Sequence, residues 1–309
     1  MREKGSRSVN EAGRGEVASR RLMAVHAHPD DESSKGAATL AKYAAEGADV
    51  MVVSCTGGER GDILNKSYVQ TDEPLVQVRR REMAAAAEIL GVHHVWLGFE
   101  DSGYHEGPPE TWQLPEGSFA ALDPEPETLA LVRLIRSFRP QVVITYDENG
   151  GYPHPDHIRT HVVSVAAVEA AADPGRYPDA GAPWQVAKLY YHGGFSRKRL
   201  EAINAVMKEF NGTEPFAAWL ERMDRNARAD RTSKVTTRVD VCDYLEVRDA
   251  ALRAHATQIA PDDDHWFAVP HQVESAVWGT DDYELVWSKV ESALPEDDLF
   301  AGITQRVSA

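Results

Sequence analysis

LMAVHAHPDDE, residues Leu22–Glu32, joins an apolar run of strand length to a turn that carries histidine, proline and three acidic residues. The stretch Val142–His157, VVITYDENGGYPHPDH, has the same arrangement, with a short apolar run followed by glycines and a second His-Pro-Asp turn. Ligands of an open parallel sheet bind at the carboxyl ends of its strands. The two stretches therefore predict a parallel sheet with a polar site where these two strands end.

The segments around these stretches alternate between apolar runs and helical patterns. The predicted strands are Leu22–Ala27, Val50–Cys55, His94–Leu97 and Val142–Tyr146. The predicted helices are Ser33–Glu46, Pro74–Leu90, Glu125–Phe138 and Pro155–Ala172. Strands that alternate with helices form βαβ units, whose sheet is mostly parallel and covered by helices on both faces. The sequence therefore predicts an α/β, Rossmann-like fold.

The pattern is weaker after Pro174, where we expect an α/β extension of the same body. Its predicted strands and helices are Lys188–His192, Val235–Val241, Arg197–Phe210, Phe216–Arg225 and Tyr244–Ala256. The Asp-rich segment Pro261–Thr280 is predicted to be a long loop. Residues 1–20 are basic and small polar residues without an apolar segment, which predicts a disordered leader rather than a secretory signal. We expect one domain over residues 21–309, with the extension covering about 175–309.

Composition excludes several classes of partner. The 309 residues include 33 Lys and Arg against 49 Asp and Glu, a net charge of −16. This acidic excess argues against nucleic acid, because phosphate backbones are bound by clustered basic residues. No run approaches the ~18 consecutive apolar residues of a membrane span, so no membrane partner is expected. Cys55 and Cys242 fit no disulfide framework, which predicts a reduced, cytoplasmic setting.

Histidine and aspartate at the two strand ends indicate a metal site. His28 and Asp31 are three residues apart in the first turn, and His157 follows the fourth predicted strand. Two imidazole nitrogens and one carboxylate oxygen suit Zn²⁺, and three protein ligands leave one position for the water that catalysis needs. The same set also accepts Fe²⁺. We therefore predict His28, Asp31 and His157 as the ligands of one Zn²⁺ or Fe²⁺.

Neighbouring residues are candidates for the other catalytic roles. Asp30, next to Asp31, is expected to face the bound water as a general base. His154 lies three residues before His157 and is expected near the reacting carbonyl, with a helix N-cap as its alternative role. Tyr152 is expected either to take part in catalysis or only to pack within its loop. Four further polar residues are expected either to contact substrate hydroxyls or to form ordinary salt bridges: Glu59, Arg60, Arg79 and Asp101.

Two motifs resemble the hallmarks of the LmbE-like, or PIG-L, deacetylase family. They are AHPDDE at Ala27–Glu32 and HPDH at His154–His157, and both are intact. The likeness runs from about Arg21 to Ile303. It includes the segments TGGERGD at Thr56–Asp62, WLGFEDSG at Trp96–Gly103, RAHATQI at Arg253–Ile259 and LFAGI at Leu299–Ile303. The resemblance implies the LmbE-like fold and a metal-dependent hydrolase.

The resemblance also implies roles residue by residue. The motif residues that match the family's zinc ligands and general base are His28, Asp31, His157 and Asp30. His154 matches a histidine that acts as an acid or steadies the oxyanion, and Asp156 matches the aspartate that tunes it. Tyr152 matches a mobile tyrosine that polarises the carbonyl. The residues that match substrate contacts are Glu59, Arg79, Asp101 and Lys35, the last being typical of an amidase branch of the family.

The activity implied by the resemblance is that of a zinc amidase acting on a small-molecule thiol conjugate. Such an enzyme cuts the amide between glucosaminyl-inositol and an S-substituted N-acetylcysteine, and so serves detoxification. The alternatives are the sister deacetylase, which acts on N-acetylglucosaminyl-inositol, and a non-catalytic sugar- or metal-binding protein. Intact Asp30 and His154 argue against the latter, because binding alone needs neither base nor acid. The segment Pro261–Gly279 departs from the family and is expected on the thiol-conjugate side of the pocket.

Overall fold

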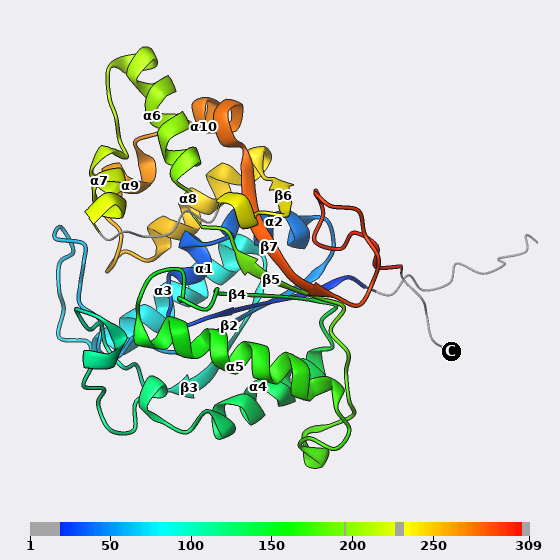
Figure 1. The fold of residues 1–309 in the computed structure, drawn as a ribbon. Helices are drawn as coiled ribbons and strands as arrows, with labels where there is room; N and C mark the ends of the chain where they lie inside the picture. The colour runs from blue at the N-terminus through cyan, green and yellow to red at the C-terminus, as the bar shows by residue number, and fades with distance from the viewer. Residues whose placement is uncertain (1–18, 195, 226–231, 305–309) are drawn as a thin grey trace, which may run out of the picture.

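The computed structural model describes residues 19–194, 196–225 and 232–304, and their strands form a seven-stranded sheet (Figure 1). The strand order is β3-β2-β1-β4-β5-β7-β6. The strands are β1 Arg21–His26, β2 Asp49–Thr56, β3 His93–Phe99, β4 Val142–Thr145, β5 Lys188–His192, β6 Thr237–Asp240 and β7 Thr280–Ser288. Strands β1 to β5 are parallel to one another, and β7 is antiparallel to both β5 and β6. This confirms the predicted mostly parallel α/β sheet, whereas most of the predicted leader lies outside the described residues.

The helices cover both faces of this sheet. Their bounds are α1 Asp31–Ser34, α2 Ala37–Ala45, α3 Leu75–Leu90, α4 Pro124–Phe138, α5 Pro155–Ala172, α6 Arg197–Asn211, α7 Ala217–Arg225, α8 Leu245–Ala254, α9 Asp264–Phe267 and α10 His271–Trp278. The helix predicted at Ser33–Glu46 is split, because Gly36 has a φ of +85° and separates α1 from α2. None of the helices in the described ranges is long and apolar enough to cross a membrane.

The strand order reverses next to β1, which places a crevice beside it. Leu22 of β1 is paired with Val50 of β2 on one side and with Val142 of β4 on the other. The chain leaves β1 toward β2 and β3 and later returns to its opposite side as β4. Connections that diverge in this way leave a ligand-binding crevice at the carboxyl ends of the strands. The two His-Pro-Asp turns directly follow β1 and β4, so both lie at this crevice.

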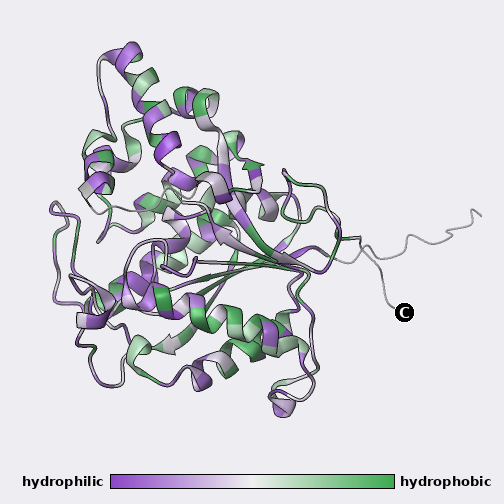
Figure 2. Cartoon of the chain, in the orientation of Figure 1, coloured by the Kyte–Doolittle hydropathy of each residue, from purple (hydrophilic) through white to green (hydrophobic). Residues whose placement is uncertain are grey.

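Alternate residues of β1 supply the two halves of the core. Leu22 is fully buried on the face covered by α2 and α3, where it belongs to the same hydrophobic cluster as Leu40. Met23 is fully buried on the other face, in the cluster that contains Leu131 of α4. Figure 1 shows α4 and α5 on this second side of the sheet, opposite α2 and α8. Figure 2 shows hydrophobic residues along the central strands, whereas α5 carries both hydrophobic and hydrophilic residues.

The C-terminal part extends the same sheet and adds a group of helices above it (Figure 1). The prediction of a long loop over Pro261–Thr280 is wrong, because α9 and α10 lie within it. Strand β7 was not predicted, since its sequence starts with Asp281 and Asp282 and aspartate is depleted in strands. The structure compensates both carboxylates: Asp281 accepts hydrogen bonds from the backbone and hydroxyl of Thr39, and Asp282 accepts one from Trp278.

Candidate metal centre and active site

The loops that follow β1 and β4 bring two predicted metal ligands together. His28 is the second residue after β1, and His157 lies in the first turn of α5. Their ring centres are 5.3 Å apart. Both side chains are withdrawn from solvent, with 8% of His28 and none of His157 exposed. The sheet topology therefore joins residues that are more than a hundred positions apart in the sequence.

His157 is oriented by the backbone of the glycine loop. Its Nδ1 lies 2.9 Å from the carbonyl oxygen of Gly150. A carbonyl oxygen only accepts hydrogen bonds, so Nδ1 carries the hydrogen and neutral His157 keeps a lone pair on Nε2. That Nε2 atom is buried and has no hydrogen-bond partner among the described residues. Gly150 and Gly151 have positive φ values of +70° and +73°, a backbone conformation that favours glycine.

His28 is oriented by a carboxylate. Its Nε2 lies 3.1 Å from Oδ2 of Asp156, which also accepts a hydrogen bond from the Ser102 amide at 2.9 Å. In the neutral form that can bind a metal, the Nε2 hydrogen therefore points to Asp156 and Nδ1 keeps the lone pair. Metal-bound imidazoles are commonly held in this way by a carboxylate. Asp156 was expected to tune His154; instead its carboxylate contacts His28, and only its backbone amide reaches His154.

Asp31 lies between the two free imidazole nitrogens. Its Oδ2 is 3.5 Å from Nδ1 of His28 and 3.3 Å from Nε2 of His157. Two atoms that are each 2.0–2.1 Å from a tetrahedral Zn²⁺ lie about 3.3–3.4 Å apart. The other oxygen, Oδ1, is held by Nζ of Lys35 at 2.6 Å. The two distances to Asp31 are those expected between ligands of one divalent metal. Among the described residues, the groups whose ligand atoms all lie within 4.8 Å of one another are His28, His154 and His157, and His28, Asp101 and Asp156. The set His28, Asp31 and His157 therefore stays a prediction.

The electrostatics of this cluster favour a positive charge at its centre. Burial opposes the charged form of His28, but Asp101, Asp156 and Asp31 outweigh it and raise the pKa of His28 well above its usual value. Burial also opposes ionisation of Asp31, but His157 and Lys35 outweigh it and hold its pKa well below the usual value. A bound cation supplies the charge that such a cluster of carboxylates favours.

His154 caps helix α5 beside the predicted ligands. Ligand-capable atoms of His28, His154 and His157 lie within 4.8 Å of one another. However, Nδ1 of His154 accepts a hydrogen bond from the Asp156 amide at 3.2 Å and caps α5, which confirms its N-cap role. The hydrogen of neutral His154 is then on Nε2. Burial, together with His28 and His157, lowers the pKa of His154 to about 2, so the ring stays neutral.

Asp30 is held in a strained backbone conformation beside the ligands. Its φ of 94° lies in the left-handed region, which costs a residue other than glycine about 1–3 kcal/mol and is typical of functional sites. Its Oδ2 is 3.1 Å from Nη2 of Arg79. The same guanidinium donates to the carbonyl oxygens of Pro29 and Gly58 at 2.8 and 3.2 Å. Burial raises the pKa of Asp30 while Arg79 opposes this shift, so the carboxylate has a fixed position and an increased basicity.

Tyr152 and Lys35 line the exposed side of the cluster. The ring of Tyr152 is 37% exposed, and its centre lies 4.5 Å from that of His157. Nζ of Lys35 lies 5.8 Å from the centre of the Tyr152 ring. Desolvation and the charge of Asp31 raise the pKa of Tyr152 well above its usual value. Its hydroxyl therefore stays protonated and is a hydrogen-bond donor.

The predicted sugar contacts lie on the loops after β2 and β3. Asp101 accepts hydrogen bonds from the amides of Arg60 and Gly103 at 3.0 and 2.8 Å. Glu59 is exposed but accepts a hydrogen bond from the Asp101 amide at 3.1 Å. These two residues and Arg79 thus hold the loops around the site together. Direct contact with a sugar stays a prediction for all three.

The sequence reasoning missed three residues that support the site. Tyr146 stacks on His157 with ring centres 4.4 Å apart. Nε2 of His255 lies 2.7 Å from Oε1 of Glu32, and both side chains are fully buried. The other oxygen of Glu32 accepts a hydrogen bond from the Asp30 amide at 3.0 Å, which connects the backbone of Asp30 to the residue that ends α8. The available signals were the position of Tyr146 at the end of a predicted strand and that of His255 within RAHATQI.

The fold and the site together define a hydrolytic enzyme of the PIG-L family, to which this chain belongs. The family model, described as GlcNAc-PI de-N-acetylase, matches residues 23–168 and so includes both His-Pro-Asp turns. The mycothiol S-conjugate amidase of Streptomyces coelicolor is 55% identical over 288 residues, which are 92% of this chain and 97% of that protein.

One further relative and one solved structure are similar to this chain. The 1D-myo-inositol 2-acetamido-2-deoxy-alpha-D-glucopyranoside deacetylase of Streptomyces avermitilis is 40% identical over 302 residues, 92% of this chain and 97% of that protein. The solved structure of N,N'-diacetylchitobiose deacetylase from Pyrococcus horikoshii matches with a TM-score of 0.58 and 18% identity, covering 87% of this chain and 84% of that one. At this identity the structural likeness shows the fold alone.

Proposed function

We propose that this protein is a metal-dependent amidase that cleaves mycothiol S-conjugates into glucosaminyl-inositol and a mercapturic acid. The observation that carries the proposal is the difference in identity: 55% to the amidase against 40% to the deacetylase, over the same 92% of this chain. Lys35, the residue typical of the amidase branch, supports it further because its ammonium group contacts Asp31. The substrate would be a small-molecule thiol conjugate.

We assign the metal to His28, Asp31 and His157 and propose that it is Zn²⁺, with Fe²⁺ as the alternative for the same donor set. The support is the pair of lone-pair nitrogens set by Asp156 and Gly150, both directed at one Asp31 oxygen. When bound, such a metal polarises the amide carbonyl and acidifies the attacking water.

The chain itself supplies the proton transfers. Asp30 takes the proton of the attacking water, and Arg79 keeps its carboxylate in position. The hydroxyl of Tyr152 and the Nε2 hydrogen of His154 donate to the developing oxyanion. Because the low pKa of His154 keeps that ring neutral, protonated Asp30 is the group that returns the proton to the leaving amine.

The second candidate is deacetylation of N-acetylglucosaminyl-inositol, which the 40% identity to a deacetylase supports. The two reactions cut an amide of the same sugar amine and differ in the acyl group. Product analysis separates them. The metal-loaded protein is expected to release the free sugar amine and an S-substituted N-acetylcysteine from an S-conjugate, and Asp30→Asn serves as the control for contaminating amidases. A conjugate that stays intact after incubation with the metal-loaded protein would contradict the proposal.

The proposal covers the whole of residues 21–309 as one catalytic domain, whose part from about residue 175 completes the substrate pocket. Its support is that β5, β7 and β6 continue the sheet that carries the metal site. A reduced, cytoplasmic setting also belongs to the proposal. Its support is that Cys55 and Cys242 are both free thiols.

A further inference from the structure

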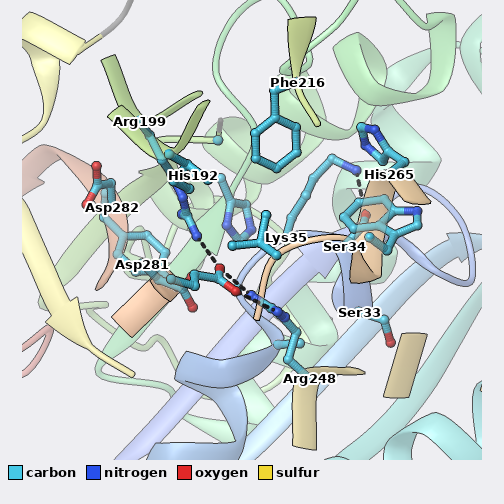
Figure 3. Close-up of a pocket in the computed structure, with 18 residues that line it drawn as sticks. Ser33, Ser34, Lys35, His192, Arg199, Phe216, Arg248, His265, Asp281 and Asp282 are labelled. Carbon is cyan, nitrogen blue, oxygen red and sulfur yellow. Dashed lines mark hydrogen bonds and ion pairs between the residues drawn. The ribbon is translucent and has the colours of Figure 1, made fainter. Parts of the chain in front are cut away.

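A pocket adjoins Lys35 and is lined by residues other than the predicted metal ligands (Figure 3). We name it the distal pocket and define it by Lys35, Gly36, Phe216, His265 and Trp266. Its walls come from the turn between α1 and α2, from α6 and α9, and from the segments around α10 and β7. The cavity itself has a volume of about 60 Å³, and the empty space around it, open solvent included, is about 770 Å³.

Lys35 connects the distal pocket to the metal centre. Its Nζ is 2.6 Å from Oδ1 of Asp31, while its side chain also lines the pocket. The substrate amide joins a sugar amine to an acyl group. The atoms of an acyl group longer than acetyl need space on the carbonyl side of the scissile bond. The distal pocket lies within reach of such a group, because one side chain separates it from Asp31. An acetyl group has no atoms that would need this space.

One wall of the distal pocket is apolar and aromatic. Phe216, Ile203 and Val269 are 6%, 2% and 9% exposed and belong to one hydrophobic cluster. Trp266 lies beside His265, with ring centres 4.8 Å apart. Figure 3 shows Phe216 and His265 on the same side of the pocket as the Lys35 side chain. Such a wall binds apolar groups with little discrimination between shapes.

The opposite wall presents buried polar atoms. Nε2 of His192 and the hydroxyl of Tyr283 are buried, and no residue in the described ranges makes a hydrogen bond with them. Both groups lie beside Gly36, where a Cβ would be 2.9 Å from the Tyr283 hydroxyl and 3.1 Å from Cε1 of His192. Unpartnered buried polar groups are rare in folded proteins. A ligand with an amide or carbonyl group would supply the missing partners.

The charged residues that line the distal pocket include two arginines that are paired with carboxylates. Arg199 and Arg248 both donate to Oε1 of Glu274, at 2.9 and 2.6 Å (Figure 3). Arg248 also contacts Asp249 at 2.8 Å. Two arginines thus face two carboxylates, so this part of the pocket does not favour an anionic ligand. The pocket suits an uncharged apolar group attached to an amide.

We propose that the distal pocket binds the S-substituted N-acetylcysteinyl half of the substrate. The S-substituent lies against Phe216 and Trp266, the acetamide is within reach of His192 and Tyr283, and Lys35 stands between this half and the scissile amide. This inference rests on the proposed function, since only a cysteinyl acyl group would occupy the pocket. It names the part of the chain that recognises the thiol conjugate.

The test compares S-benzyl and S-methyl conjugates of glucosaminyl-inositol N-acetylcysteine as substrates of the metal-loaded protein. Wild type is expected to prefer the S-benzyl conjugate by roughly 10-fold in kcat/KM, the size of a contact in an apolar pocket. Phe216→Ala and Trp266→Ala are expected to reduce this preference at least about threefold. Trp266→Ala is included because Phe216 is part of a buried cluster, and thermal unfolding checks that each variant is folded. Phe210→Ala, on the same group of helices but 64% exposed, is the matched control.

Calorimetric binding of S-benzyl-N-acetylcysteine to the same proteins separates this inference from the proposed function. In one outcome, wild type hydrolyses the conjugates while folded Phe216→Ala and Trp266→Ala keep the full benzyl preference. That result would overturn the assignment of the distal pocket and leave the proposed amidase activity standing. If wild type hydrolyses neither conjugate, the amidase fails. In that case, weaker binding of S-benzyl-N-acetylcysteine to Phe216→Ala and Trp266→Ala than to Phe210→Ala would still support the distal pocket as its binding site. Equal or undetectable binding to all three variants would overturn that assignment.

Discussion

Nδ1 of His157 donates a hydrogen bond to the carbonyl oxygen of Gly150 across 2.9 Å, which directs the unprotonated Nε2 toward Asp31. Position 150 has no room for a side chain, because a Cβ there would lie 2.5 Å from Cβ of His157. The loop after β4 therefore fixes both the tautomer and the position of this imidazole. Removing a hydrogen bond of this kind to a metal ligand typically weakens metal affinity by about 10- to 100-fold.

This relationship predicts different effects for two neighbouring glycines. Gly151→Ala places a residue at a φ of +73° where nothing lies within 4 Å, so it is expected to lower the free energy of unfolding by only about 1 kcal/mol. Gly150→Ala has a similar φ but adds the clash with His157, so it is expected to weaken metal binding as well. Metal titration of both variants checks this, and equal affinities would show that Gly150 does not position His157.

Removal of a predicted ligand is expected to remove the metal. Purified wild type should hold about one divalent ion per chain, and His28→Ala or His157→Ala should lose it. His93→Ala, whose side chain is 74% exposed, is the control that keeps the metal. Metal analysis of the three variants is the measurement. Full occupancy in both ligand variants would rule out this site.

Asp156 provides a second test of the same geometry. Since its carboxylate contacts His28, Asp156→Ala is expected to weaken metal affinity by about 10- to 100-fold. If Asp156 acted instead by tuning His154, the variant would bind metal normally and lose only rate.

Asp30→Asn is expected to keep its metal and lose roughly 10²–10⁴-fold in kcat, the usual range for a general base. Asparagine is chosen because it tolerates the positive φ at this position. The measurement pairs steady-state kinetics with metal analysis of the same sample. A variant that is inactive because it is metal-poor would make Asp30 a ligand instead of a base.

The sequence predicted that the two His-Pro-Asp turns come together, because the polar residues of the candidate site are concentrated in two short motifs. His28, Asp31 and His157 follow β1 and β4, and a parallel sheet brings such positions to one edge. The orientation of each ring was not predictable, since it depends on contacts between distant segments. Asp156 illustrates this: its place within HPDH suggested a contact with its neighbour His154, but the fold turns its carboxylate toward His28.

The fold was predicted best where hydrophobic patterning is strong. Helix Pro155–Ala172 and strand Lys188–His192 have the predicted bounds. Strand β7 was missed because aspartate is depleted in strands and the groups that stabilise Asp281 and Asp282 include Thr39 of α2 and Trp278 of α10, which come close only in the folded chain. The distal pocket was hidden for the same reason: Lys35 and Phe216 are 181 positions apart in the sequence and line it together only in the folded chain.

Glu127 is expected to make stability depend on pH. It is fully buried, and its nearest ion-pair contact is Arg159 at 3.7 Å. Burial raises the pKa of Glu127 from 4.5 to about 8. Between these values the folded protein holds a proton that the unfolded chain has lost, so this group's contribution to stability falls as pH rises from about 4.5 through about 8.

Glu127→Gln keeps the neutral form at every pH and is therefore expected to gain on wild type as pH rises over this interval. The difference in the free energy of unfolding should grow by roughly 1–3 kcal/mol between pH 5 and pH 8. Glu125→Gln, on the exposed side of the same helix, should show no such trend. Urea unfolding of metal-saturated protein measures both, and a constant difference across pH would contradict the assignment.

The ratio of kcat/KM for two substrates, measured on one metal-loaded preparation, tests the proposed function most directly. The substrates are an S-benzyl conjugate of glucosaminyl-inositol N-acetylcysteine and N-acetylglucosaminyl-inositol, which share the sugar and differ in the acyl group. The account predicts a larger kcat/KM for the conjugate, and a smaller ratio after Lys35→Ser, since Lys35 stands beside both Asp31 and the distal pocket. A larger kcat/KM for the acetylated sugar would contradict the account and make the chain a deacetylase.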